Sequence, residues 1–121
     1  MEVITQAFAD RFASEWIEAW NSRDLDRILA HYDDDFEMSS PMIIRIAGEP
    51  SGRLCGAKNV RAYWSKALEM IPDLHFEWVA TFAGVDSVAI HYRGANGRPA
   101  LEVFHFGPAG RVKQAFAHYQ S

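Results

Sequence analysis

The chain has few of the residues and patterns that mark disulfide-stabilised, membrane or nucleic-acid-binding proteins. It contains one cysteine, Cys55, which can form no internal disulfide, so we expect a reducing, cytoplasmic compartment. It has no apolar run of about eighteen residues and no leader-type N-terminus, so we expect neither a membrane-spanning helix nor a secretory signal. Its net charge is −4 and it lacks a run of lysines or arginines, which argues against a nucleic-acid partner.

Aromatic residues, in contrast, are abundant. The chain holds 8 phenylalanines, 4 tryptophans and 4 tyrosines among its 121 residues. Such a large aromatic surface must be buried, line a cavity or meet a partner. A chain of this length can bury a core without disulfides, and no repeat, low-complexity tract or linker divides it. We therefore expect a single domain that spans residues 1–121.

The first third of the chain predicts two helices. Apolar residues recur at every fourth position from Ile4 to Trp20, which indicates one long amphipathic helix that begins at Met1. Asp24 is placed to cap a shorter helix whose apolar positions run to Tyr32. The three aspartates at 33–35 are interpreted as a solvated turn, because three adjacent side chains cannot converge on one metal ion without further ligands.

The middle of the chain predicts an interrupted strand, a loop and a third helix. Residues 36–44 have the character of a strand but contain Pro41, which indicates a sheet edge or a bulge. Residues 48–56 are rich in glycine and proline and indicate a loop. Their glycine spacing fits neither the Walker pattern nor GxGxxG, so we expect no phosphate site there. Residues 57–70 have a helical apolar face, and Pro72 ends that helix.

The last third, residues 73–119, predicts four antiparallel strands joined by tight turns. Asn96 and Gly97 lie between two alternating runs, and this dipeptide favours a two-residue type I′ hairpin turn. With such a turn His91 pairs with Glu102, so that an imidazole faces a carboxylate. Helices that precede a run of antiparallel strands indicate an α+β fold with the helices on one face of the sheet.

The turn registers also assign side chains to the two faces of the predicted sheet. One face combines large aromatic residues with alanines and a small polar cluster, and a roof of helices over it would enclose a concavity. Its members are Phe76, Trp78, Ala80, Phe82, Ala89, His91, Arg93, Ala100, Glu102, Phe104, Ala115, Ala117 and Tyr119. The other face is rich in β-branched and aromatic residues, such as Val88, Ile90 and Tyr92, and we expect a two-fold partner subunit to cover it.

Two stretches of the chain carry a resemblance to a known family. The first runs from Trp16 to Phe36 and includes Tyr32 followed by the aspartates at 33–35, and the second comprises residues 102–106, 110–112 and 117–119. Together they resemble the nuclear transport factor 2-like superfamily, and most closely its SnoaL-like and ketosteroid-isomerase branches. The resemblance spans nearly the whole chain.

That resemblance implies a fold but no single activity. The implied fold is a cone-shaped, curved antiparallel β-sheet wrapped around three N-terminal and central helices, a cystatin-like α+β roll. A deep apolar pocket and a homodimer through the outer face of the sheet are also implied. Isomerases, cyclases, hydrolases, dehydratases and non-enzymatic binders all share this fold, so the activity has to be argued from the site.

The ketosteroid-isomerase branch offers one template for such a site. There a carboxylate base, a tyrosine and a protonated aspartic acid handle an enolate. Matching motifs place the tyrosine at Trp16, the base at Ser40 and the acid at Glu102. Only Glu102 keeps a carboxyl group, and a serine hydroxyl is too weak a base to take a proton from carbon. The resemblance therefore does not carry that reaction over, but Ser40 and Trp16 are expected to line the pocket and donate hydrogen bonds.

The predicted His91–Glu102 pair has two interpretations. In a catalytic one, Glu102 orients His91, which acts as general acid or base toward a bound small molecule. In a structural one, the pair is a satisfied cross-strand contact in the pocket wall, with Arg93 as a further partner for Glu102. The histidines at 31, 75, 105 and 118 do not gather on one face, so we expect no metal site, and no cofactor is indicated.

Two classes of function follow, with a scaffold whose cone is filled as a third. The chain either binds a hydrophobic or aromatic small molecule, or is an enzyme of isomerase, cyclase or hydrolase type that moves a proton through the His91–Glu102 pair. The residues expected to line the ligand site are Trp16, Trp20, Ser40, Trp64, Phe76, Trp78, Arg93, Phe104, Ala117 and Tyr119.

Overall fold

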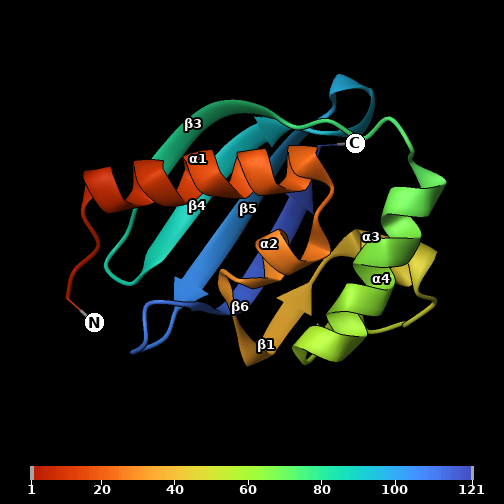
Figure 1. The fold of residues 1–121 in the computed structure, drawn as a ribbon, viewed down its shortest axis with the longest axis horizontal. Coiled ribbons are helices and arrows are strands. Elements are labelled where there is room, and N and C mark those ends of the chain that lie inside the picture. The colour runs from red at the N-terminus through yellow and green to blue at the C-terminus, as the bar shows by residue number, and fades with distance from the viewer. Residues whose placement is uncertain (1, 121) are drawn as a thin grey trace.

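A curved six-stranded sheet forms the centre of the computed structural model, which describes residues 2–120 (Figure 1). The strands are β1 (Tyr32–Ser39), β2 (Arg53–Cys55), β3 (Glu77–Ala83), β4 (Ser87–Arg93), β5 (Pro99–Phe106) and β6 (Val112–Tyr119). The α-helices in this range are α1 (Gln6–Ser22), α2 (Leu25–Leu29), α3 (Pro41–Ile46) and α4 (Ala57–Met70). The α+β class predicted from the sequence is confirmed.

The strand order is β2-β1-β6-β5-β4-β3. Neighbouring strands are antiparallel except β1 and β6, which run parallel. The resemblance implied an antiparallel sheet, and the structure differs from it in this one pair of strands. Helix α1 crosses one face of the sheet over β3, β4 and β5, while α3 and α4 lie beside the β1 end (Figure 1). Among residues 2–120, no helix is both long enough and apolar enough to cross a membrane.

Helix α1 begins at Gln6 rather than at the predicted Met1, which lies outside the described residues. Thr5 is the reason for this start, since its side chain accepts a hydrogen bond from the Phe8 amide at 3.1 Å and caps the helix. The amide of Ile4 instead donates to the Val85 carbonyl at 3.0 Å, which ties the preceding segment to the β3–β4 turn. The predicted apolar stripe is buried from Ala9 to Trp20, while Phe8 near its start is half-buried.

Helix α2 is capped by Asp24 as predicted, because its carboxylate accepts from the amides of Asp26 and Arg27. The helix is shorter than expected and ends at Leu29, since Tyr32 already belongs to β1. The aspartates at 33–35 therefore lie in a strand rather than in a turn. Tyr32 and Phe36 are four residues apart, a spacing that suits either a helix or one face of a strand. The sequence pattern therefore did not show that Tyr32 and the three aspartates belong to a strand.

Pro41 starts a helix instead of interrupting a strand. It occupies the first turn of α3, where a missing amide hydrogen costs nothing, and the Ser40 hydroxyl accepts from the Met42 amide at 3.1 Å. The following loop contains the short strand β2, which the glycine-rich composition concealed. In contrast, α4 has the predicted bounds, Ala57 to Met70.

The hairpin between β4 and β5 differs from the predicted one by one residue. Asn96 and Gly97 have φ values of 58° and 71°, so their predicted left-handed conformation is confirmed. The loop nevertheless has three residues, because Ala95 joins them in a 3₁₀ turn closed by the Gly94 amide on the Arg98 carbonyl at 2.9 Å. This extra residue reverses the face of every β4 side chain relative to β5.

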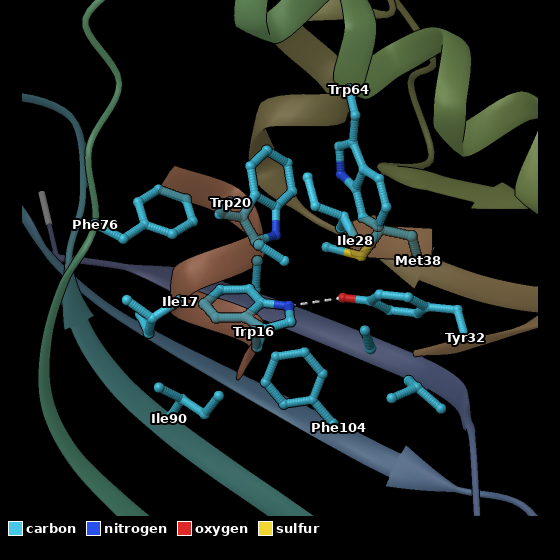
Figure 2. Close-up of a cluster of buried hydrophobic side chains, with 14 of the residues drawn as sticks. Trp16, Ile17, Trp20, Ile28, Tyr32, Met38, Trp64, Phe76, Ile90 and Phe104 are labelled. Atoms are coloured by element: carbon cyan, nitrogen blue, oxygen red, sulfur yellow. Dashed lines mark hydrogen bonds between the residues drawn. The ribbon is translucent and has the colours of Figure 1, made fainter. Parts of the chain in front are cut away.

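The core lies between α1 and the sheet. Figure 2 shows Trp16 at its centre, between Phe104 of β5 and Trp20 one turn further along α1. The Trp16 indole is stacked on Phe76 with ring centroids 5.5 Å apart, and its Nε1 donates to the Tyr32 hydroxyl at 2.9 Å. This hydrogen bond joins the first helix to the first strand in the buried interior.

Candidate ligand-binding cavity

A cavity of about 640 Å³ lies beside this core, between the sheet and the helices α1, α3 and α4. Its aromatic lining residues are Trp16, Trp20, Tyr63, Trp64, Phe76, Tyr92 and Tyr119. Its other polar and charged lining side chains are Arg45, Asp73, His75, Asn96, Arg98 and Glu102. A volume of this size suits a drug-sized molecule, which needs roughly 300–1,000 Å³.

Three indoles and a phenyl ring form the apolar wall of the cavity. Trp16 and Trp20 project from successive turns of α1, and Trp64 comes from α4, with its ring centroid 5.1 Å from that of Trp20. Phe76 precedes β3 and lies 5.4 Å from Trp20 (Figure 2). Because these rigid rings contact one another, they give this wall of the cavity a fixed shape.

Glu102 is the ionisable carboxyl group at the floor of the cavity. It lies in β5, is only 4% exposed and accepts a hydrogen bond from the Tyr92 hydroxyl on Oε1 at 3.1 Å. Burial raises the pKa of Glu102 from 4.5 to about 7, although the Tyr92 hydrogen bond opposes this rise. Near neutral pH this carboxyl is therefore present both protonated and charged, and it can either donate or accept a proton.

The tyrosines around Glu102 remain protonated. Burial is the largest cause that raises the pKa of Tyr119 to about 12, the charge of Glu102 adds to this effect, and the Ser40 hydroxyl opposes it. Burial likewise raises the pKa values of Tyr63 and Tyr92. The floor of the cavity thus combines one carboxyl that can change its charge with phenols that supply neutral hydroxyl groups.

Six of the residues singled out from the sequence line this cavity. They are Trp16, Trp20, Trp64, Phe76, Glu102 and Tyr119. Three more lie buried around it: Phe104 packs on Trp16 with ring centroids 5.2 Å apart, Ala117 pairs with Glu102, and Ser40 caps α3. These residues come from α1, α4, the last two strands, the segment before β3 and the N-terminus of α3, which the fold brings together.

The predicted His91–Glu102 pair is wrong. With the longer loop, His91 pairs with Leu101, while Ile90 stands opposite Glu102. The His91 side chain therefore lies on the outer face of the sheet, where it lines a separate shallow groove of about 280 Å³ together with His118. It cannot exchange a proton with Glu102 from there, so the proton relay proposed from the sequence has no geometric basis.

Arg93 and Trp78 also lie away from the cavity. Arg93 follows the same reversal of β4, is exposed and donates to the Gly97 carbonyl at 3.4 Å. Trp78 is 40% exposed on the edge strand β3, next to a bulge, and its Nε1 donates to the Thr81 hydroxyl. Neither side chain can serve the ligand site that the sequence predicted for it.

Tyr63 and Tyr92 were missed by sequence reasoning. A signal for each was present: Tyr63 precedes Trp64 on the apolar face of α4 and is four residues from Ala67, while Tyr92 continues the alternation of Val88 and Ile90. Val88, Ile90 and Tyr92 are together more apolar than Ala89, His91 and Arg93, and they are the β4 residues that are buried. Across residues 2–120, no three His, Cys, Asp or Glu side chains gather as metal ligands.

Comparisons with known proteins identify the family. A SnoaL-like domain model matches residues 13–115. A SnoaL-like protein of unknown function from Burkholderia thailandensis is 72% identical, with a TM-score of 0.95 over 99% of this chain and 100% of that one. A comparison with curated proteins found no match.

Two more distant structures share the fold. A protein of unknown function with a cystatin-like fold from Methylobium petroleophilum has a TM-score of 0.76 at 19% identity, covering 98% of this chain and 80% of that one. A proposed isomerase of the SnoaL-like family from Agrobacterium tumefaciens has a TM-score of 0.75 at 14% identity, covering 93% and 97%. The chain belongs to the SnoaL-like domain family.

Proposed function

We propose that this chain binds a ring-containing, largely apolar small molecule in the cavity of about 640 Å³, with a polar group of that molecule hydrogen-bonded to Glu102. The buried Glu102 carboxyl on the cavity floor is the observation that carries this proposal. Burying a carboxyl group costs free energy unless it is well hydrogen-bonded, and the Tyr92 hydroxyl supplies one bond. A ligand hydroxyl or carbonyl would supply another.

The apolar wall supports a ring as the body of the ligand. Trp20, Trp64 and Phe76 present flat surfaces to the cavity, and aromatic guests gain both buried area and favourable ring contacts from such surfaces. Met38, Met42 and Met70 complete the lining with flexible side chains that adapt to the outline of a guest. An apolar ring with one polar group therefore matches the cavity better than a sugar or a nucleotide.

A cavity-filling variant tests this binding. Ala67 lines the cavity from α4, so Ala67→Phe places a ring where the ligand would lie, whereas Ala62 on the same helix is exposed and Ala62→Phe serves as the matched control. Isothermal titration with 2-naphthol should show binding to the wild type and the control, and at least about tenfold weaker binding to Ala67→Phe. Equal affinity for all three proteins would contradict a ligand in this cavity. Native mass spectrometry of the purified wild type would reveal any molecule that co-purifies.

A second candidate function is catalysis with Glu102, instead of His91, as general acid or base. The specific observation in its favour is the pKa of Glu102 near 7, which suits proton transfer at neutral pH. Glu102→Gln keeps the shape of the side chain but cannot release a proton. For any substrate found, turnover should be lost in this variant and should follow a titration near pH 7 in the wild type. Undiminished turnover by Glu102→Gln would contradict a catalytic role of Glu102, and ligand binding would be its remaining role.

We also propose that the protein is cytoplasmic, because its one cysteine is an exposed, free thiol. Cys55 is free and exposed, and such thiols persist in reducing compartments. Freshly isolated protein should react with Ellman's reagent at one thiol per chain without prior reduction. A disulfide-linked pair of chains in non-reducing electrophoresis would contradict this location.

A further inference from the structure

The mouth of the cavity carries two arginines that come from different parts of the chain. Arg45 lies on α3, three residues after Met42 and one before Ile46, and all three line the cavity. Residues three and four apart share one face of a helix, so the cavity-lining face of α3 includes the exposed side chain of Arg45. Arg98 directly follows the three-residue loop between β4 and β5, and the residues of this loop also line the cavity.

Arg98 is electrostatically close to the polar floor of the cavity. Its positive charge is one of the influences that lower the pKa of Tyr119, and the charge of Glu102 raises the pKa of the same phenol. Tyr119 is thus within electrostatic range of both the guanidinium of Arg98 and the carboxyl of Glu102, and all three side chains line one cavity. Glu102 is buried and Arg98 is exposed, so a molecule that reaches from Glu102 toward solvent can meet the cation of Arg98.

The charges that line the cavity outside Glu102 favour an anion. Arg45 and Arg98 face one acid, Asp73, and one histidine, His75. This local excess of positive charge occurs in a chain whose net charge is −4. Positive groups around a concave, partly dehydrated opening attract anionic ligands more strongly than the same charges on an open surface.

Within the part of the chain that the structure describes, neither Arg45 nor Arg98 has an ion-pairing partner. Within residues 2–120, Arg27 pairs with Glu15 and Glu18, Arg61 pairs with Asp26, and no acid lies within ion-pairing distance of Arg45 or Arg98. Asp73 lines the same cavity but forms no ion pair with either. Planar guanidinium groups that are free of internal partners are well suited to bind a carboxylate.

We propose that Arg45 and Arg98 form a carboxylate subsite at the cavity mouth, so that the ligand is an amphipathic organic acid with an apolar ring body. This inference rests on the proposed function and names the class of molecule that the cavity takes. The ligand's polar but uncharged end lies at Glu102, and its carboxylate lies at the arginines. A carboxylate placed next to Glu102 would be repelled once that group ionises, which fixes the orientation of the acid.

A matched pair of probes tests the subsite. 2-Naphthylacetate and 2-naphthylacetamide share a ring system and nearly the same size and differ in charge. Isothermal titration at low salt should show the acid binding the wild type at least about tenfold more tightly than the amide, with the difference shrinking as potassium chloride is added. The double variant Arg45→Gln/Arg98→Gln should lose about tenfold or more of its affinity for the acid and keep its affinity for the amide within about twofold.

Controls separate this subsite from general electrostatic attraction. Arg111→Gln removes an exposed arginine on the β5–β6 turn that is not one of the residues lining the cavity, and should change neither affinity. The single variants Arg45→Gln and Arg98→Gln should each show a partial loss for the acid. Equal binding of acid and amide to the wild type, or equal losses for both probes in the double variant, would overturn the carboxylate subsite while leaving an apolar ligand at Glu102 in place. Failure of both probes to bind the wild type would contradict the proposed function itself and the subsite with it.

Discussion

Glu102 is the residue whose environment departs furthest from what its chemistry favours. A carboxyl group on a central strand is surrounded by Tyr92, Tyr119 and the apolar wall, and its burial raises its pKa to about 7. This burial lowers the stability of the folded protein. Between pH 4.5 and about 7 the folded protein holds a proton on Glu102 that the unfolded chain has released. The free energy of unfolding therefore falls as the pH rises through this window.

Glu102→Gln should remove this pH dependence. Each pH unit between the two pKa values is worth about 1.4 kcal/mol, so the variant should gain roughly 3 kcal/mol of stability relative to the wild type between pH 5 and pH 8. Urea unfolding of both proteins at the two pH values measures this gain. Glu69→Gln, which changes an exposed carboxylate on α4, should show no such trend. A constant difference between Glu102→Gln and the wild type would mean that Glu102 is not desolvated.

The two tryptophans of α1 provide a matched test of a buried hydrogen bond. Trp16 Nε1 donates to the Tyr32 hydroxyl, whereas the buried Nε1 of Trp20 has no partner among the described residues 2–120. Trp16→Phe should cost about 1–3 kcal/mol more stability than Trp20→Phe, because only the first substitution leaves a buried hydroxyl without its donor. Urea unfolding with unchanged m values measures the difference. Equal costs would show that the loss of ring volume alone decides stability at both sites.

At the scale of single elements, local signals in the sequence predicted conformation better than register. The left-handed backbone of Asn96 and Gly97 and the bounds of α4 were predictable because each depends on residues nearby. The number of residues in the β4–β5 loop was not, since Asn-Gly suits both a two-residue and a three-residue turn. The one additional loop residue places His91 on the outer face and Tyr92 in the cavity. Glu102 therefore has Tyr92 as its hydrogen-bond partner instead of the predicted His91.

Asn96 tests the conformation of that loop. Its φ of 58° strains most side chains, so Asn96→Ala should destabilise the protein by about 1 kcal/mol while Asn96→Gly stays close to the wild type. Thermal and urea unfolding both measure this contrast. If alanine and glycine had the same effect, the loop would not hold position 96 in the left-handed region.

At the scale of the whole molecule, the outer face of the sheet is more apolar than a solvated surface requires. Leu101 is 38% exposed at the centre of this face, between His91 and His118 in the neighbouring strands, and Phe82 is exposed nearby on β3. The sequence predicted a partner subunit on the face opposite the pocket. In β4 the change of register moves Val88, Ile90 and Tyr92 from that face into the core, whereas Leu101 and His118 stay on the outer face, and a partner subunit there remains a prediction.

We therefore predict a homodimer through the outer face. The wild type should sediment as a dimer at micromolar concentration, and Leu101→Lys should sediment as a monomer, because a lysine there would be buried without a partner. Ile44→Lys, which changes an exposed apolar residue on α3, should remain a dimer. A monomeric wild type, or a dimer unaffected by Leu101→Lys, would contradict this interface.

The family and the cavity were more predictable than the chemistry inside it. Trp16, Trp20 and Trp64 were assigned to the cavity from helical spacing and family resemblance, which depend on long stretches of sequence. The hydrogen-bond partner of Glu102 depends on the register of the β4–β5 hairpin. Sequence reasoning assigned Tyr119 to the ligand site but Tyr92 to the opposite face, and only the folded chain brings the Tyr92 hydroxyl to the carboxyl group.

The most direct test of a ligand held against Glu102 is a crystal structure of the wild-type protein with 2-naphthol. We predict electron density for the naphthalene ring in the cavity, packed against the wall that Trp20 and Phe76 form, with its hydroxyl within about 3 Å of a Glu102 oxygen. Density in the shallow groove beside His91 and His118 instead, or a ring in the cavity whose hydroxyl points away from Glu102, would contradict the account.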